Sequence, residues 1–408
     1  MDDSHSLLPG ATAAFAADRI WPLTGLEGGP LRDHAVVVEG GRIQSVSPRA
    51  ALSIAGPTAG LAAGPAEIPV RDLGNVDLVP GFIDVQVNGG GGALFNDSPD
   101  LPGLRTIVRA HRRFGTTSLL PTFITDGLAG MRRARAAIEE CLQTSEPGVL
   151  GVHFEGPFLD ERKVGAHDAD LVRAPGDEDL AVIAAETGGV TLLTLSANAY
   201  TEEVAAALRA AGVIVALGHC ASTYEEATAA FDRGATGVTH LFNAMSPLES
   251  RAPGLVGAAL ASTQASCGLI LDGVHVSYGA ARAAQRALGR DRLMLVTDAV
   301  QPVGSDVTEF MLGGSRVRLE EGRCVNEAGR LAGSALDMAT AVRNAVRELG
   351  LGLEEAVWMA TRSPARFLGL EAEVGALGAG MRADFTLLDA ELRVVGTAVG
   401  GQLELEPA

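Results

Sequence analysis

Residues 80–92 read PGFIDVQVNGGGG, an apolar run that ends in polar residues and opens into four consecutive glycines. Buried strands of a parallel sheet are near-continuous apolar runs, and the loops at their carboxyl ends hold the functional groups of barrel enzymes. We interpret this stretch as a strand that delivers Gln86 and Asn88 to such an end. The rest of the chain decides which kind of sheet the strand belongs to.

Seven further segments of this kind follow, each short, apolar and ending in polar residues. They span 115–122, 149–157, 190–198, 212–219, 235–243, 267–273 and 292–299. Alanine-rich stretches with helical spacing lie between them, for example at 131–143, 201–212 and 224–234. Strands that alternate with helices predict an α/β fold with a parallel sheet covered on both faces. Eight such units in roughly 220 residues favour a TIM-like (β/α)8 barrel over an open doubly wound sheet.

The two ends of the chain have a different pattern, with short strands of the kind found in β-hairpins. Residues 36–39 and 42–46 flank a Gly-Gly turn, and residues 383–405 are also rich in β-forming positions. We expect one small β-sandwich domain built from both termini, with the Ala/Gly/Pro-rich stretch 50–66 as a surface loop. The predicted domains are 1–76 and 372–408 for this sandwich and 77–371 for the barrel.

The composition describes a globular chain without a basic surface. Apolar residues make up 47% and charged residues 20% of the 408 positions, and the formal net charge is −18. This charge, with no cluster of Lys and Arg, argues against nucleic acid as a partner. No apolar run reaches the length of about 18 residues that a membrane span needs, and the first ten residues are acidic where a signal peptide is basic. We therefore expect a cytoplasmic protein with no membrane partner.

Three predicted strand ends carry residues that bind metals. Glu155 lies in GVHFEGPF, His219 in VALGHC and His240 in GVTHLFNAM. A catalytic metal needs about three protein ligands and one open position, and histidine with carboxylate suits zinc or ferrous iron. A single histidine at a strand end is more often structural. Three metal-binding residue types at three strand ends of one barrel favour a metal site. Cys220 is not expected to be a ligand, because adjacent strand residues point to opposite faces.

A fourth strand end, VTDA, carries Asp298. A carboxylate beside a metal-activated water can accept its proton and later pass it to a leaving nitrogen. The alternative is a cap for the following segment, since Asp is favoured at that position. The neighbouring metal-type residues favour the acid/base role.

Seven motifs now define a resemblance to a known family. The motifs PGFIDVQVNG, GVHFEGPF, LGHC, THLFNAM, DGVHV, VTDA and LAGS occur in this order. Together they resemble the N-acetylglucosamine-6-phosphate deacetylases of the amidohydrolase superfamily, over a span from about Leu78 to Asp389. The resemblance implies a metal-dependent hydrolase that removes acetate from N-acetyl-D-glucosamine 6-phosphate and leaves D-glucosamine 6-phosphate, in amino-sugar catabolism or recycling.

The resemblance also implies roles for individual residues. It places the metal on Glu155, His219 and His240, makes Asp298 the general acid/base, and brings His167 to the acetyl carbonyl, where it would stabilise the developing oxyanion. The positions that match substrate contacts are Ala166, Asn243, Ala244, Arg251, His275, Leu331, Ala332 and Gly333. Arg251 would bind the phosphate, for which its fork of donors is suited. His275 would reach the substrate of a neighbouring subunit, which implies a homodimer.

The pair Gln86 and Asn88 departs from most amidohydrolases, which carry His-x-His at this place. Part of the resembled family also has Gln-x-Asn, and those members look like single-metal enzymes. Neutral amides are poor ligands for zinc beside imidazoles and carboxylates. We therefore expect one divalent metal per subunit, zinc with ferrous iron as the alternative, and we expect the two amides to form hydrogen bonds around the pocket.

Two alternative functions compete with this interpretation. One is a different amidohydrolase on the same barrel, acting on a cyclic amide or a purine, and the phosphate-type positions Asn243 and Arg251 argue against it. The other is a metal-containing binding protein without catalysis, and Asp298 beside the presumed ligands argues against that. The stretch GAHDAD at 165–170 departs from some members of the resembled family, so the contacts to the sugar stay open. The sequence also leaves open the metal's identity, the oligomeric state and the tolerance for other sugar phosphates.

Overall fold

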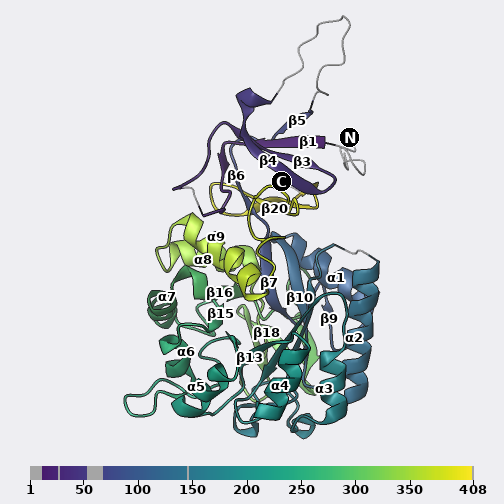
Figure 1. The fold of residues 1–408 in the computed structure, drawn as a ribbon, viewed down its shortest axis with the longest axis vertical. Coiled ribbons are helices and arrows are strands. Elements are labelled where there is room, and N and C mark those ends of the chain that lie inside the picture. Colours follow the sequence, from purple (N-terminus) through teal and green to yellow (C-terminus); the bar gives the residue numbers. More distant parts are fainter. Residues whose placement is uncertain (1–11, 26–27, 53–67, 145–146, 407–408) are drawn as a thin grey trace, which may run out of the picture.

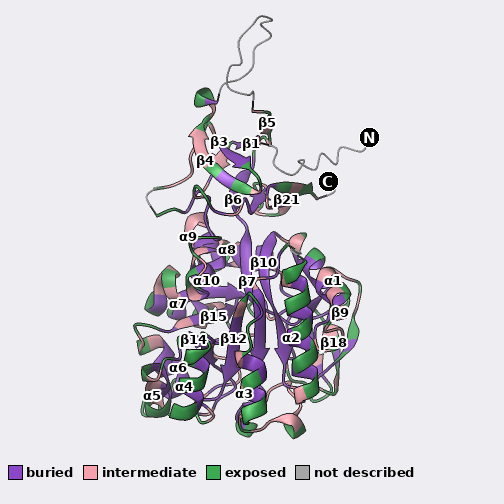
Figure 2. Cartoon of the chain, turned by 45° about the vertical axis from the view of Figure 1, so that its right-hand side comes forward, coloured by how far each residue is buried: buried purple, intermediate pink, exposed green. Residues whose placement is uncertain are grey.

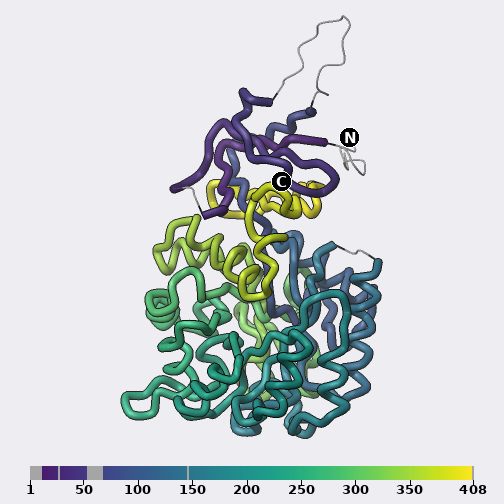
Figure 3. The backbone as a smooth tube through the Cα atoms, in the orientation of Figure 1, coloured from purple at the N-terminus to yellow at the C-terminus, as the bar shows by residue number. Residues whose placement is uncertain are grey.

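The computed structural model describes residues 12–25, 28–52, 68–144 and 147–406. Two units are visible in Figure 1 and in the backbone tube of Figure 3: a barrel, and a smaller β domain in which the purple and yellow ends of the chain come together. Most of the loop predicted at 50–66 lies outside the described residues. Within the described part of the chain, no helix combines the length and apolar character needed to cross a membrane.

The predicted barrel is confirmed, because all eight expected strands join one parallel sheet. The strands are β7 (Phe82–Val87), β10 (Thr116–Ile124), β11 (Gly151–Glu155), β12 (Val190–Leu195), β13 (Ile214–Leu217), β14 (Gly237–Val238), β15 (Ser266–Ile270) and β16 (Leu293–Val296). Each pairs with its neighbour in chain order, from β7 through β10 to β16. Their carboxyl ends therefore face the same side, as the placement of the polar residues requires.

Helices connect and cover these strands. They are α1 (Leu101–Arg112), α2 (Leu128–Gln143), α3 (Asp177–Ala184), α4 (Glu202–Ala210), α5 (Tyr224–Asp232), α6 (Gly254–Ala261), α7 (Tyr278–Arg292), α8 (Met338–Arg347), α9 (Leu353–Ala360) and α10 (Arg362–Phe367). The three helical stretches expected from the sequence coincide with α2, α4 and α5. Helix α5 begins at a capping box, in which the Thr223 hydroxyl accepts from the Glu226 amide and the Glu226 carboxylate accepts from the Thr223 amide.

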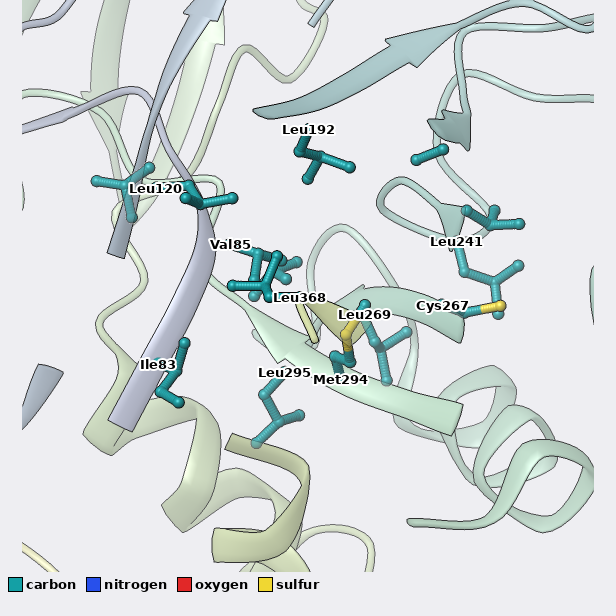
Figure 4. Packing of buried hydrophobic residues seen from close by; sticks show 14 of the residues in the cluster. Ile83, Val85, Leu120, Leu192, Leu241, Cys267, Leu269, Met294, Leu295 and Leu368 are labelled. Atoms are coloured by element: carbon teal, nitrogen blue, oxygen red, sulfur yellow. The ribbon is translucent and has the colours of Figure 1, made fainter. Parts of the chain in front are cut away.

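The apolar pattern of the strands accounts for the core. Figure 2 shows buried strands inside a shell of helices whose outer sides are exposed. Figure 4 shows Val85 of β7, Leu269 of β15 and Leu368 after α10 in this one cluster of buried side chains. On α2, Met131, Ala134, Ile138 and Cys141 are buried at the spacing of one helix face.

The seam between the first strand, β7, and the segment after the last, β16, is closed by main-chain and side-chain bonds. The amide of Asp298 donates to the carbonyl of Gln86 at 3.0 Å. The Thr297 hydroxyl donates to Asp84 Oδ2 at 2.5 Å, and the amides of Gln86 and Thr297 donate to Asp84 Oδ1. Burial raises the pKa of Asp84 to about 7. The Asp84 side chain thus fixes the register in which Gln86 meets Asp298.

The expected sandwich of both termini is also confirmed. Its two sheets have the orders β4-β3-β1-β5 and β2-β6-β20-β21-β22. The strands are β1 (Thr12–Ala17), β2 (Arg19–Ile20), β3 (His34–Glu39), β4 (Arg42–Pro48), β5 (Val70–Asp72), β6 (Asp77–Pro80), β20 (Phe385–Leu388), β21 (Val394–Val399) and β22 (Gln402–Leu405). The rings of Phe15 and Phe385, one from each sheet, lie 5.0 Å apart in the shared core. The domain boundaries at 76/77 and 371/372 stay predictions.

A three-stranded antiparallel sheet, which we call the flap, was not predicted. It consists of β17 (Glu309–Leu312), β18 (Ser315–Glu320) and β19 (Arg323–Asn326), between β16 and α8. The sequence does hold its signal, because apolar and charged residues alternate along β18, SRVRLE, and Gly313–Gly314 forms the turn before it. Gly313 has φ +54°, and a side chain there would collide with the carbonyl oxygen of Ala166. The flap therefore packs closely on the loop after β11.

The seam bonds predict the effect of removing one hydroxyl. Thr297→Val should lower the free energy of unfolding by about 1–3 kcal/mol, because a buried Asp84 oxygen loses its donor. Thr297→Ser, which keeps the hydroxyl, should lower it less. Urea unfolding of the metal-free proteins measures both values, and equal stability of the valine and wild-type proteins would contradict this role of the seam.

Candidate active site

A cavity of about 390 Å³ opens at the carboxyl ends of the barrel strands. Twelve of the residues singled out in the sequence line it: Asn88, Glu155, Ala166, His167, His219, His240, Asn243, Ala244, His275, Asp298, Leu331 and Gly333. These residues come from separate strand ends and loops, so the fold brings together side chains far apart in the chain. The volume is within the range of small-molecule sites.

Two of the predicted substrate contacts do not line this cavity. Ala332 is buried in a separate apolar cluster with Val300 and Phe310. Arg251 is exposed on the loop between β14 and α6. His275 does line the cavity of its own chain, and its Nδ1 lies 2.6 Å from Asp272 Oδ2.

The three predicted metal ligands converge, as expected. His240 Nε2 lies 2.8 Å from Glu155 Oε1 and 3.0 Å from His219 Nε2, and His219 Nε2 lies 3.3 Å from the same carboxylate oxygen. All three residues are buried, and their ligand atoms lie within 4.8 Å of one another. Burial acts to raise the pKa of Glu155, but hydrogen bonds and charges of the two histidines outweigh it and hold the pKa well below its ordinary value.

This donor set fits a divalent cation. The carbonyl of Lys163 lies 2.8 Å from His219 Nδ1 and can only accept a hydrogen bond, so Nδ1 carries the hydrogen. Nε2 of His219 therefore presents a lone pair toward Glu155 and His240. Two imidazole nitrogens and a carboxylate oxygen are a ligand set of zinc and ferrous iron.

The backbone is unusual at three of these positions. His219, His240 and Asp298 have φ values of +47°, +33° and +53°. A positive φ is uncommon for residues other than glycine, and such strain gathers at functional sites. Each residue lies where a barrel strand ends and the chain turns, and hydrogen bonds on both sides hold it there.

The amides of Gln86 and Asn88 form hydrogen bonds to the carboxylates, as the sequence predicted. Gln86 Nε2 donates to both Glu155 oxygens at 3.3 Å and to Asp298 Oδ1 at 3.1 Å. Asn88 Nδ2 donates to Asp298 Oδ1 at 2.6 Å. Since ionised carboxylates only accept, the amide nitrogens must face them. The two amides therefore act as neutral hydrogen-bond donors to the carboxylates.

Asp298 has the electrostatic surroundings of a base. Burial, followed by the negative charge of Glu155, raises its pKa to about 6, while the hydrogen bond from Asn88 acts in the opposite direction. A carboxyl group with a pKa near the working pH can both accept and return a proton. Asp298 lines the cavity beside the Glu155, His219 and His240 cluster, so it could exchange a proton with a molecule bound there.

His167 lies in the same cavity and is held as a neutral donor. The amide of Thr125 donates to its Nδ1 at 3.4 Å, and the Thr125 hydroxyl lies 2.8 Å from the same nitrogen. The hydrogen therefore resides on Nε2. Burial, followed by the charge of His219, lowers the pKa of His167 to about 3. Thr125 was not predicted as a site residue, because the strand was expected to end at 122, whereas β10 continues to Ile124.

A buried polar layer that the sequence did not indicate lies beneath the cluster. His153 precedes Glu155 by two residues on β11, so both side chains point to the same face. Its Nε2 lies 2.7 Å from Thr194 Oγ1, its Nδ1 lies 3.1 Å from Thr122 Oγ1, and burial lowers its pKa to about 4. Thr194 continues the layer to the hydroxyl of Thr239 at 2.6 Å. Both ring nitrogens have partners, so this histidine is a structural residue.

Cationic residues also line the cavity. They are Arg162, Lys163 and Arg330. These three residues were not predicted as site residues, since an Arg or Lys in a loop carries no signal by itself. Glu161 lines the same mouth, so both charges are present there, and the three cations are the groups that would contact an anionic ligand.

A (β/α)8 barrel with a Glu/His/His cluster and a half-buried aspartate at its mouth defines the class of metal-dependent hydrolases. The chain belongs to the amidohydrolase family, whose model matches residues 78–403. This match and the relatives described next confirm the resemblance inferred from the seven motifs.

Several characterised proteins are similar over nearly the whole chain. An N-acetylgalactosamine-6-phosphate deacetylase of Shewanella sp. strain ANA-3 is 46% identical over 83% of this chain and 86% of its own. An N-acetylglucosamine-6-phosphate deacetylase of Haemophilus influenzae is 35% identical over 91% and 95%. The crystal structure of the N-acetylglucosamine-6-phosphate deacetylase of Pasteurella multocida superposes with a TM-score of 0.89 at 35% identity, covering 97% of this chain and 100% of that one.

The contact between Asn88 and Asp298 predicts a pKa change. In Asn88→Ala the pKa of Asp298 should rise above about 6, because the ionised carboxylate loses its shortest donor. A difference infrared titration of metal-free protein, with Asp298→Asn to assign the carboxyl band, measures it. Asn96→Ala is the matched control, since the Asn96 amide bonds only to the main chain of Ile124. An unchanged pKa in Asn88→Ala would refute the assignment.

Proposed function

We propose that this protein removes acetate from N-acetyl-D-glucosamine 6-phosphate and releases D-glucosamine 6-phosphate. The observation that carries the proposal is one cavity holding the Glu155, His219 and His240 cluster, the base Asp298 and the neutral donor His167. The deacetylase names of relatives that share this fold over most of its length support it.

We assign one divalent cation per chain to Glu155, His219 and His240, zinc with ferrous iron as the alternative. Such a cation lowers the pKa of a water and so supplies a nucleophile near neutral pH. The donor role of the Gln86 and Asn88 amides supports a single-metal site, because both nitrogens already face carboxylates. Histidines are neutral when they bind a metal, so Glu155 and the two histidines would then contribute one negative charge among them, which favours a dication.

The protein's own side chains would then carry the proton and the charge. Asp298 accepts a proton as water attacks the acetyl carbonyl carbon, and passes it to the sugar nitrogen as the carbon–nitrogen bond breaks. His167, with its hydrogen on Nε2, donates to the carbonyl oxygen as negative charge develops there. Because His167 is neutral, it adds no positive charge beside Glu155, His219 and His240 before the reaction.

The rest of the cavity would hold the sugar and its phosphate. Lys163 and Arg330 offer positive charge at the mouth, and Leu331 and Gly333 form part of the wall. We retain the phosphate role of Arg251. Phosphate binding supplies energy that positions the distant amide.

A homodimer stays part of the proposal. Leu248 and Val274 are exposed large apolar residues, 57% and 42% accessible, close in sequence to Arg251 and His275 respectively. Burial of this pair against a second copy would bring Arg251 and the loop that carries His275 to the contact. A phosphorylated sugar does not cross membranes freely, which supports a cytoplasmic enzyme of amino-sugar use.

The C4 epimer is a second candidate substrate. The relative that is 46% identical is a deacetylase of N-acetylgalactosamine 6-phosphate. The two sugars differ only in the orientation of one hydroxyl, and the reacting amide and the phosphate are the same. A shared site for both is therefore compatible with the cavity.

Acetate release by metal-loaded protein tests the proposal directly. We expect release from one or both 6-phosphorylated N-acetylhexosamines and little from the unphosphorylated sugars, because the phosphate supplies binding energy. The ratio of kcat/KM for the two epimers identifies the substrate. Absence of acetate from all four sugars would overturn the proposed function.

The role of Asp298 predicts both a variant and a pH profile. Asp298→Asn should retain the metal and lose about 10²–10⁴-fold in kcat, since general acid–base catalysis contributes this much. In the wild type, kcat should fall as the pH drops through the pKa of Asp298, because the protonated carboxyl cannot accept a proton. That limb should lie at or below about pH 6, since a nearby cation favours the ionised form. Stopped assays with metal analysis check this, and wild-type turnover in the variant would exclude the role.

A further inference from the structure

The orientation of His219 depends on a main-chain group of the loop after β11. Its Nδ1–H donates to the carbonyl of Lys163 at 2.8 Å, which leaves Nε2 to face Glu155 and His240. Partners of this kind hold a metal-binding histidine in one tautomer and one ring orientation. The position of the Lys163 carbonyl is therefore a condition for a competent cluster.

A single side chain shapes the turn that presents this carbonyl. Lys163 ends a 3-10 turn, Glu161–Lys163, which is capped by Asp160. Asp160 Oδ1 accepts from the amide of Arg162 at 3.0 Å, and the carbonyl of Asp160 accepts from the amide of Lys163 at 2.8 Å. Movement of Asp160 would shift the turn and its last carbonyl.

Asp160 is also bonded to the strand end that carries His219. Its amide donates to the carbonyl of His219 at 3.0 Å, and the amide of Ala221 donates to its Oδ2 at 3.2 Å. These bonds flank a residue with φ +47°, a conformation that needs support from its surroundings. One residue thus holds both the backbone of the ligand and the acceptor for its ring.

We propose that Asp160 is a positioning residue for the metal site, which sets the tautomer and direction of His219 through the Lys163 carbonyl. The Asp160 side chain is 7% exposed, whereas that of its ion-pair partner Arg162 is 65% exposed. Exposed ion pairs contribute little, so the effect comes from the hydrogen bonds that the Asp160 carboxylate accepts from the main-chain amides of Arg162 and Ala221. The inference rests on the metal site and is independent of which sugar is the substrate.

The test measures metal retention without any substrate. Asp160→Ala should release bound zinc to a chelator about 10–100-fold faster than the wild type, the usual cost of losing an outer partner of a metal ligand. It should also alter the visible absorption of the cobalt-substituted protein, which reports ligand geometry. Asp160→Asn keeps one oxygen acceptor and should release zinc at an intermediate rate, so the series remains informative if the alanine variant folds poorly.

Two controls separate positioning from general loosening of the loop. Asp168 caps the next 3-10 turn in the same way, with Asp170 N at 3.0 Å from its Oδ1, and the described structure shows no bond from it to His219. Asp168→Ala and Arg162→Ala should both release zinc at the wild-type rate. Equal release from the Asp160 and Asp168 variants, or wild-type release from both Asp160 variants, would overturn the proposal. Failure to deacetylate any sugar would leave these release rates, and the inference, unaffected.

Discussion

The closure of the barrel between β7 and the segment after β16 is the constraint on which the rest of the site depends. Asp84 lies wholly inside this seam and takes hydrogen bonds from Thr297 and from the amide of Gln86. The groups that meet in the cavity lie just beyond these partners. They are Gln86 and Asn88, two and four residues after Asp84, on one side and Asp298, the residue after Thr297, on the other. A slip of one residue in this register would turn these side chains out of the barrel, because side chains alternate along a strand.

Two carboxylates, the buried Glu155 and the half-buried Asp298, lie near each other in this cavity and repel. The Gln86 amide donates hydrogen bonds to both carboxylates and the Asn88 amide donates to Asp298. These bonds stabilise the carboxylates against their mutual repulsion without adding charge. The result is a division of roles by environment: hydrogen bonds and charges of two histidines keep Glu155 strongly acidic, whereas burial brings the pKa of Asp298 to about 6. The Gln-x-Asn pair thus gives this barrel a site with one ligand cluster and one separate base.

The loop after β11 supplies several groups of the site whose connection is not visible in the sequence. Within a few residues it supplies Asp160, the carbonyl of Lys163 and the donor His167, and the turn of the flap packs on it at Gly313. The same loop and the turn after β19 bring Lys163 and Arg330 to the mouth of a protein whose net charge is −18. The proposed phosphate binding therefore depends on where these cations lie and not on the net charge.

The sequence by itself determined the eight barrel strands, the sandwich of both termini and the Glu155, His219 and His240 cluster, because apolar periodicity and the polar ends of parallel strands are local properties that one fold class satisfies. The flap was also within reach, since its alternation and Gly-Gly turn are visible in the chain. Only the tertiary structure decided the tautomers of His167 and His219, the pKa of Asp298 and the role of Asp160. These depend on main-chain carbonyls and amides, on burial and on neighbours far away in the chain, and the identity of a residue carries no record of any of them.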